Sequence, residues 1–238
     1  MKRRTFVATT GAVVGSALLP GALHSGAPSD GPVVLFQGDS ITDCGRDRKN
    51  PHPNAADALG NGYPLLIAST LLAAQPGRGF RFYNRGVSGN TVPDLDARWQ
   101  ADTLDLAPDV LSILIGVNDY WHVLMGTYHG TVDDYAHELE SLLTRTRQSR
   151  PGIRLVLLEP FTLRTGVVKD SWFPEFDQRR AVAGRVAERA GAALVPLQAM
   201  FDGLTRNSPP AYWSGDGVHP TAAGHGAIAK AWMDAVQL

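Results

Sequence analysis

The sequence predicts an α/β fold, in which three layers (α/β/α) are built around a five-stranded, mostly parallel sheet. From residue 32 onward, short and almost entirely apolar runs alternate with longer amphipathic runs. Strands that are apolar throughout are typical of a parallel sheet that is buried on both faces. The chain has 238 residues, enough for one domain of this kind with a substantial core.

Five apolar runs are predicted strands, and five amphipathic runs between or after them are predicted helices. The strands are expected at Val33–Gln37, Phe80–Asn84, Val110–Ile115, Ile153–Glu159 and Ala192–Pro196. The helices are expected at Tyr63–Ala74, Pro93–Thr103, Val132–Gln148, Phe176–Ala190 and Thr221–Val236. Pro93 suits the first turn of a helix, and Gly191 suits a C-terminal cap. The alternation implies right-handed crossovers in an open sheet.

Two polar segments fall outside this alternation and are predicted to be long loops. They are Arg46–Asn61, which contains Pro51 and Pro53, and Thr162–Pro174, which carries Trp172. Long loops in a compact domain are often functional. Neither segment is rich enough in Pro, Gly or Ser to act as a linker, so residues 31–238 are predicted to form a single domain.

Residues 1–30 are predicted to be an export signal and leader. Three basic residues, Lys2, Arg3 and Arg4, precede an apolar run, Phe6–Leu19, that Pro20 ends. This run is too short for a membrane span, which needs about 20 apolar residues, so no membrane anchor is expected. The Arg-Arg start resembles a twin-arginine signal. We therefore expect a secreted or periplasmic protein; the alternative is an ordinary basic N-terminus.

Charge and cysteine content narrow the possible partners. The formal net charge is −1, which gives no electrostatic case for binding nucleic acid or an anionic membrane. Cys44 is the only cysteine, so an internal disulfide and a multi-cysteine metal site are both impossible. The expected partner is a small-molecule or oligosaccharide substrate, and a homo-oligomer is possible.

Reactive residue types follow the predicted strands, at the edge where an open parallel sheet binds its ligands. Ser40 follows the first strand, Gly86 the second and Asn118 the third, while Asp216 and His219 precede the last helix. They supply a hydroxyl nucleophile, a turn whose backbone N–H can be exposed, an amide donor, an imidazole and a carboxylate. This set is sufficient for acyl transfer.

Each residue type has a task in that chemistry. Neutral imidazole can take the proton of Ser40 during attack, and the carboxylate of Asp216, three residues before His219, can orient the imidazole. The oxyanion that forms needs donors already aimed at it. The N–H of Ser40, the N–H of Gly86 and the amide of Asn118 could supply them.

Each residue taken alone has a plainer interpretation. Gly-Asp-Ser can be a simple turn, Gly86 a left-handed turn residue, and Asn118 a helix cap. Asp216 and His219 could be a helix cap and a histidine whose hydrogen bonds are satisfied, or two ligands of a metal with His225. Because no third ligand stands at a convincing spacing, no metal and no cofactor are expected. The coincidence of all four segments in order favours acyl transfer.

The same segments resemble the GDSL, or SGNH, hydrolase family across essentially the whole chain after the leader. The matching blocks are Gly38–Ile41, Asn84–Thr91, Gly116–Asp119 and Asp216–Pro220. The resemblance implies a flavodoxin-like SGNH-hydrolase fold. It implies Ser40, Asp216 and His219 as the catalytic triad, and Ser40, Gly86 and Asn118 as the oxyanion hole. The first block reads Asp-Ser-Ile rather than Asp-Ser-Leu, which keeps a branched apolar residue.

Within that family the blocks look most like bacterial acetylxylan esterases and related carbohydrate acetylesterases. The resemblance implies removal of acetyl groups from xylan or xylo-oligosaccharides. Substrate contacts are expected from Asp39, Tyr63, Trp121 and Trp213. The two tryptophans are included because indole faces stack on sugars; the alternative is that these tryptophans are only packing residues. The alternative functions are a lipase, lysophospholipase or thioesterase of the same family, or a non-catalytic carbohydrate-binding module.

Overall fold

A computed structural model describes residues 31–238, and the predicted leader lies outside the described residues. It contains one five-stranded, fully parallel sheet with the strand order β2-β1-β3-β4-β5. The strands are β1 (Val33–Gly38), β2 (Arg81–Asn84), β3 (Val110–Leu114), β4 (Arg154–Leu158) and β5 (Ala193–Val195). The predicted fold class is confirmed.

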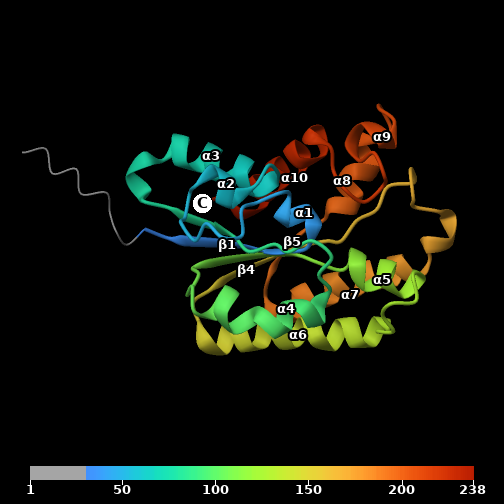
Figure 1. Ribbon diagram of the computed structural model, residues 1–238, viewed down its shortest axis with the longest axis horizontal. Coiled ribbons are helices and arrows are strands. Elements are labelled where there is room, and N and C mark those ends of the chain that lie inside the picture. Colours follow the sequence, from blue (N-terminus) through green and yellow to red (C-terminus); the bar gives the residue numbers. More distant parts are fainter. Residues whose placement is uncertain (1–30) are drawn as a thin grey trace, which may run out of the picture.

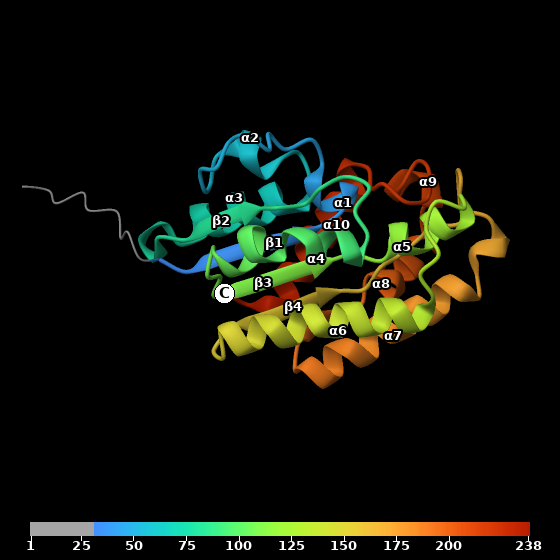
Figure 2. The same cartoon turned by 60° about the horizontal axis from the view of Figure 1, so that its bottom comes forward.

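Helices cover both faces of the sheet. Within the described part of the chain, the α-helices are α1 (Ser40–Asp43), α2 (Ala56–Leu59), α3 (Tyr63–Ala74), α4 (Val92–Trp99), α5 (Val117–Leu124), α6 (Val132–Ser149), α7 (Glu175–Ala190), α8 (Leu197–Leu204), α9 (Pro210–Trp213) and α10 (Ala222–Val236). Figures 1 and 2 show α3 and α10 on one face of the sheet and α4, α6 and α7 on the other. The arrangement is therefore three-layered.

Successive residues of β1 enter the two cores in turn. Val34 and Phe36 pack in the core beneath α3 and α10, where Trp232 also lies, whereas Leu35 packs in the core beneath α4, α6 and α7, with Trp99. Side chains alternate across a strand, so a central strand with both faces covered is expected to be mostly apolar, as β1 is apart from Gln37.

The strand order places the segments that matter for function next to one another. Strand β1 pairs with β2 on one side, with Phe36 opposite Asn84, and with β3 on the other, with Gly38 opposite Leu114. Their carboxyl ends therefore meet at one edge of the sheet. The order reverses between β1 and β3, and such a point is where open α/β sheets bind ligands.

The structure differs from the sequence prediction mainly in its short helices. Five helices of four to eight residues (α1, α2, α5, α8 and α9) were not predicted; α2 lies inside the segment Arg46–Asn61 that was predicted to be a loop. The predicted helix Pro93–Thr103 is α-helical only to Trp99 and continues as a π-helix, η2 (Gln100–Leu104). Two 3₁₀ turns, η1 (Pro76–Arg78) and η3 (Asp170–Trp172), complete the described elements. Among residues 31–238, no helix is long and apolar enough to cross a membrane.

Candidate active site

Ser40, His219 and Asp216 form a continuous hydrogen-bonded line. Ser40 Oγ lies 2.8 Å from His219 Nε2, and His219 Nδ1 lies 2.6 Å from Asp216 Oδ2. A carboxylate can only accept, so the Nδ1–H donates to Asp216, and Nε2 is left to accept the hydroxyl proton of Ser40. The fold thus brings together residues that are 179 positions apart.

The backbone also holds the carboxylate of Asp216. Its Oδ1 accepts from the N–H of Val218 at 2.9 Å and from the N–H of His219 at 2.7 Å. Burial would raise the pKa of Asp216, but the hydrogen bonds from the His219 ring, the His219 N–H and the Val218 N–H together lower it. Asp216 therefore stays ionised, as a group that orients and stabilises an imidazolium must be.

The loop after β4 supports this catalytic segment. Leu163 N–H donates to the carbonyl of Gly217 at 2.8 Å, and Val167 N–H donates to the carbonyl of Asp216 at 2.9 Å. A short antiparallel bridge between Ser214 and Pro220 closes the segment. The polar segment Thr162–Pro174, predicted to be a long loop, thus positions the catalytic loop through its backbone.

Asp39 was expected to contact substrate, and its burial makes this prediction wrong. The residue is 1% exposed, and its Oδ1 accepts from the N–H of Ile41 at 2.9 Å, which caps α1. Burial raises the pKa of Asp39 to about 7, although the Ile41 N–H and His219 act in the opposite direction. Asp39 therefore shapes the turn that presents Ser40.

Tyr63 was also expected to contact substrate, and this prediction is wrong for the same reason. The residue is fully buried under α10, and its hydroxyl lies 2.9 Å from Thr42 Oγ1. Its N–H donates to Nδ1 of His225 at 3.2 Å, and Nε2 of His225 lies 3.4 Å from Cys44 Sγ. Both ring nitrogens of His225, the third candidate for a metal ligand, therefore have partners.

The two tryptophans lie in different surroundings. The half-buried Trp121 ring lies beside the triad, with its centroid 6.3 Å from that of the His219 imidazole and 5.6 Å from that of Trp172. Trp213 packs on Tyr212, with the ring centroids 5.0 Å apart, and its Nε1 donates to Ser208 Oγ. Trp121 is thus the one that borders His219, whereas Trp213 contacts Tyr212 and Ser208.

Asn118 lies in the first turn of α5 rather than at its cap, which is Gly116. Its Nδ2 donates to the carbonyl of Asn90 at 3.1 Å. A primary amide carries two N–H hydrogens, and among residues 31–238 the second has no hydrogen-bond acceptor. The Ser40 N–H also has none there. Both groups are free to bind an oxyanion.

Gly86 does not provide a free N–H, and this expectation is corrected. Its N–H donates to Asn84 Oδ1 at 2.9 Å. The glycine is needed for another reason: a Cβ here would lie 2.4 Å from the backbone nitrogen of Asp43. Gly86 therefore lets the turn after β2 lie directly against α1.

Within the turn after β2, Gly89 carries the N–H that the sequence reasoning missed. From Arg85 to Val92, every other backbone N–H has an acceptor, and Gly89 alone has none among residues 31–238. Gly89 adopts a φ of +86° and is exposed. The next residue, Asn90, is the one bonded to Asn118, so the free N–H lies beside the amide donor. The glycine itself was the only signal in the sequence.

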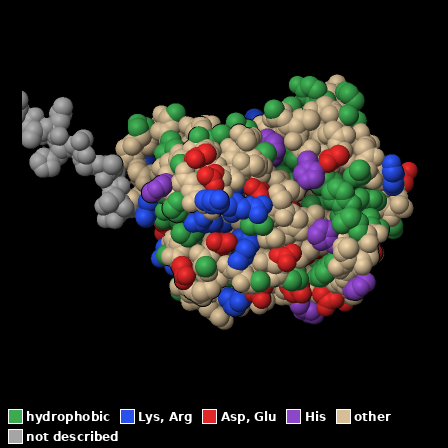
Figure 3. All heavy atoms as spheres, in the orientation of Figure 1, with side chains coloured by type: hydrophobic (Ala, Val, Ile, Leu, Met, Phe, Trp, Pro, Cys, Tyr) green, Lys and Arg blue, Asp and Glu red, His purple; other side chains and the backbone are tan. Residues whose placement is uncertain are grey.

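Exposed apolar side chains lie at the end of α5 and in the loop after β4. Leu124, Met125 and Val167 are 46%, 55% and 43% exposed, and the N–H of Val167 donates to the carbonyl of Asp216. Figure 3 shows apolar side chains grouped at the right-hand end, where Figure 1 draws α5. We call Trp121, Leu124, Met125 and Val167 the apolar rim.

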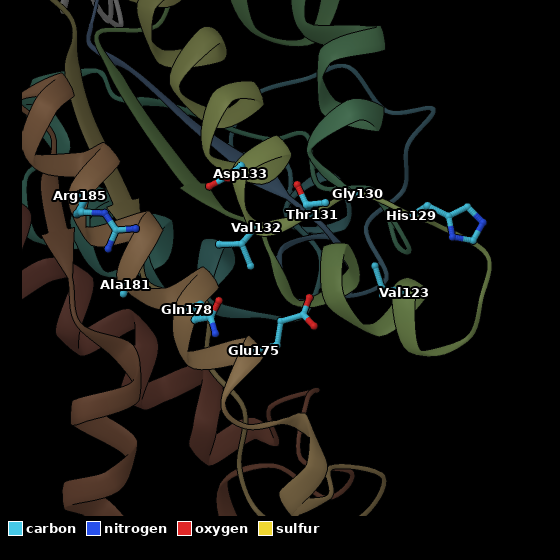
Figure 4. A pocket seen from close by; sticks show the side chains of 10 residues that line it. All are labelled: Val123, His129, Gly130, Thr131, Val132, Asp133, Glu175, Gln178, Ala181 and Arg185. Atoms are coloured by element: carbon cyan, nitrogen blue, oxygen red, sulfur yellow. The ribbon is translucent and has the colours of Figure 1, made fainter.

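A cavity of about 640 Å³ opens between the segment before α6 and the start of α7 (Figure 4). His129, Asp133, Glu175 and Arg185 supply its charged or titratable lining, and none of the predicted site residues lines it. Within residues 31–238, no three His, Cys, Asp or Glu side chains are placed to hold a metal ion.

Comparison with known proteins assigns the family. Residues 36–227 match the GDSL-like lipase/acylhydrolase family. The chain is 39% identical over 207 residues to an acetylxylan esterase from Geobacillus stearothermophilus, a match that covers 85% of this chain and 93% of that one.

Solved structures agree with this assignment. A GDSL-like protein from Parabacteroides merdae superposes with a TM-score of 0.85 at 47% identity, covering 87% of this chain and 95% of the other. Axe2, an acetylxylan esterase from Geobacillus stearothermophilus, superposes with a TM-score of 0.79 at 37% identity, again covering 87% and 95%. The chain therefore belongs to the GDSL-like lipase/acylhydrolase family and is a carboxylic ester hydrolase.

Proposed function

We propose that this esterase removes acetyl groups from acetylated carbohydrate, such as xylan or xylo-oligosaccharides, through an acyl-enzyme on Ser40. The observation that carries the mechanism is the line of two short contacts from Ser40 Oγ to His219 and from His219 to Asp216, 2.8 and 2.6 Å long. The carbohydrate assignment is supported by the relatives, since those named acetylxylan esterases match over most of the chain.

In the first half-reaction, Ser40 Oγ attacks the carbonyl carbon of the acetyl group while His219 Nε2 takes the hydroxyl proton. Asp216 stabilises the imidazolium that results. When the tetrahedral intermediate collapses, His219 gives the proton to the departing sugar oxygen. In the second half-reaction, water gives a proton to His219 and attacks the acetyl-Ser40 ester, and acetate leaves as His219 returns the proton to Ser40.

We assign the oxyanion to three donors that follow three neighbouring strands of the sheet. They are the Ser40 N–H after β1, the Gly89 N–H after β2 and the Asn118 amide after β3. Among residues 31–238, the backbone N–H groups of Ser40 and Gly89 have no acceptor, and the amide of Asn118 has one hydrogen without an acceptor. Donors that are already held in place stabilise developing charge without having to reorganise.

The environment of Trp121 supports a sugar as the alcohol part of the substrate. The half-buried indole ring lies beside His219, which has to reach the leaving oxygen. An aromatic face next to that oxygen suits the C–H face of a pyranose ring. Trp121 is therefore our candidate substrate contact, and Trp213 is a weaker one because its Nε1 already has a partner.

The apolar rim favours a second candidate, a lipase-type esterase that acts on longer acyl chains. Leu124, Met125 and Val167 are exposed apolar side chains, and Trp121 and Val167 contact His219 and Asp216. An exposed apolar patch is often a binding site. In that case the rim would hold the acyl chain. The triad chemistry would be the same, so only the substrate distinguishes the two functions.

A substrate panel distinguishes the two. The purified enzyme should release acetate from acetylated xylo-oligosaccharides, and kcat/KM should fall by roughly ten-fold or more from acetyl to octanoyl esters, because overfilling a packed site costs about 1–3 kcal/mol. A chelator should not inhibit, since no step uses a metal. Faster turnover of octanoyl esters, with no acetate from any acetylated sugar, would favour the lipase-type function.

The Ser40→Ala variant is the control for every substrate in the panel. It should remain folded and lose nearly all activity, and a serine-directed phosphonate should label wild-type Ser40 but neither Ser88 nor Ser214. Activity within a few-fold of the wild-type value would show that another group is the nucleophile.

A further inference from the structure

We infer that Asp43 is a positioning residue, which fixes the turn Arg85–Thr91 against α1 and thereby sets the place of the Gly89 N–H. The inference rests on the proposed oxyanion role of Gly89. Asp43 touches no substrate, but it determines where the N–H of Gly89 points. Asp43 ends α1, the helix that begins with Ser40.

The contact is made on the residue immediately before Gly89. Oδ2 of Asp43 accepts two hydrogen bonds from Ser88, one from its backbone N–H and one from its hydroxyl, each 3.0 Å long. The N–H of Ser88 belongs to the peptide between Val87 and Ser88, and the N–H of Gly89 belongs to the next peptide along the chain. A hydrogen bond that fixes the first peptide therefore restricts the orientation of the second. Helix α1 thus carries both the nucleophile and the anchor of a donor.

Burial and charge strengthen this anchor. Asp43 is 3% exposed, and Arg48 pairs with the same Oδ2 atom. Burial would raise the pKa of Asp43, but Arg48 and Ser88 together lower it, so the group is a carboxylate. Hydrogen bonds to an ionised acceptor are stronger than neutral ones. The turn is therefore tied to a charged group that is shielded from water.

Other hydrogen bonds fix other parts of the turn, but none of those described below is made to Ser88, the residue before Gly89. The Arg46 Nε donates to the carbonyl of Gly86 at 2.8 Å. Arg98 holds the far side, through the carbonyl of Arg85 at 2.7 Å and through Asn90 Oδ1 at 2.8 Å. Among residues 31–238, Asp43 is the only hydrogen-bond partner of Ser88.

The principal test is Asp43→Ala. Removal of the carboxylate leaves both donors of Ser88 without their acceptor, so the turn shifts. A misplacement of about 1 Å in an active site can cost 10²-fold in rate, and we expect kcat to fall by about 10–100-fold with KM nearly unchanged. Asp43→Asn, which keeps an oxygen acceptor without the charge, should recover part of this loss.

Asp109→Ala is the matched control. Asp109 is also a carboxylate that accepts a backbone N–H, from Val33 at 2.8 Å, and pairs with an arginine, Arg150. It lies directly before β3, at the opposite edge of the sheet from Ser40. Its loss should lower the melting temperature and leave kcat unchanged.

The readout specific to the oxyanion is inhibition by methylboronic acid, which forms a tetrahedral adduct on a serine. If Asp43 positions a donor, Asp43→Ala should weaken the inhibitor by the same factor as it lowers kcat/KM, since both report transition-state binding. An unchanged inhibition constant, or a kcat that falls no more than in Asp109→Ala, would overturn the inference.

A double-mutant cycle keeps the inference testable even if Asp43→Ala does not fold. Ser88→Ala removes only the hydroxyl donor, so its effect on kcat should be smaller than that of Asp43→Ala, and it should be smaller again in the Asp43→Asn background, where the acceptor has lost its charge. Fully additive effects on kcat would count against the inference. If the wild-type enzyme is active and Ser40→Ala is not, the acyl-enzyme mechanism stands, whatever the Asp43 variants show. If the wild-type enzyme has no esterase activity, the proposed function itself is wrong.

Discussion

The side-chain amide of Asn118 donates to the backbone carbonyl of Asn90, with 3.1 Å between Nδ2 and O. This hydrogen bond joins the loop after β3 to the turn after β2 across the end of β1. It orients the amide so that one N–H is used and the other is free. The contact therefore links the two donors that flank Ser40.

Asn118→Ala should lower kcat by about 10²–10³, with little change in melting temperature, because one oxyanion donor is lost. If the side chain served only to stabilise the start of α5, the loss would instead appear as about 1 kcal/mol of stability, with kcat nearly intact. Measuring both quantities on the same variant distinguishes the two roles.

Gly89→Ala should lower kcat by at least ten-fold. A left-handed conformation costs an L-residue roughly 1–2 kcal/mol, so the turn relaxes and its N–H moves, although a Cβ would meet nothing within 4 Å. Gly191→Ala is the control, because Gly191 is a left-handed glycine (φ +61°) at the C-terminus of α7. It should lose similar stability, seen as a lower melting temperature, and keep its kcat. Equal kcat values in the two variants would remove Gly89 from the oxyanion hole.

Asp39→Asn should flatten the dependence of stability on pH between about 4 and 7. Burial raises the pKa of Asp39 to about 7, above the value of about 3.9 in an unfolded chain. A carboxyl group with a raised folded pKa stabilises the fold below the unfolded pKa, and this stability is lost as pH rises through the folded pKa. Asparagine is neutral and keeps an oxygen for the Ile41 N–H, so the variant should melt higher than wild type at pH 8.

Melting temperatures measured from pH 4.5 to 8.5 test this expectation. Asp96→Asn, a change at an exposed carboxylate that pairs with Arg145, should follow the wild-type curve throughout. If Asp39→Asn also runs parallel to wild type, the carboxyl group of Asp39 does not titrate in this range.

Replacement of Arg3 and Arg4 by lysine should block export, as expected for a twin-arginine signal. The mature wild-type protein should be found outside the cytoplasm with its leader removed, while the double variant should accumulate inside the cell. N-terminal sequencing of each fraction provides the measurement. Wild-type protein that retains Met1 and stays in the cytosol would contradict the predicted secretion.

The pattern of apolar residues in the sequence was sufficient to predict the strands and long helices that form the core. The five strands are found within one residue of their predicted ends, because strands that are mostly buried form short, mainly apolar runs that can be recognised in the sequence. The short helices could not be predicted, because a helix of four to eight residues has too few turns to show a helical period of apolar residues. Even so, α1 and α5 carry Ser40 and Asn118.

The residue types of the site were also readable from the sequence, since Ser40, Asn118, Asp216 and His219 follow or precede elements that meet at one edge. Only the tertiary structure decided which neighbours are available to a substrate. Asp39 and Tyr63 are polar but buried. The N–H of Gly86 is taken by the side chain of Asn84, whereas the N–H of Gly89 has no acceptor among residues 31–238. Burial depends on contacts between residues far apart in the chain, and the acceptor that an N–H finds depends on the folded conformation of its turn, so the sequence pattern alone shows neither.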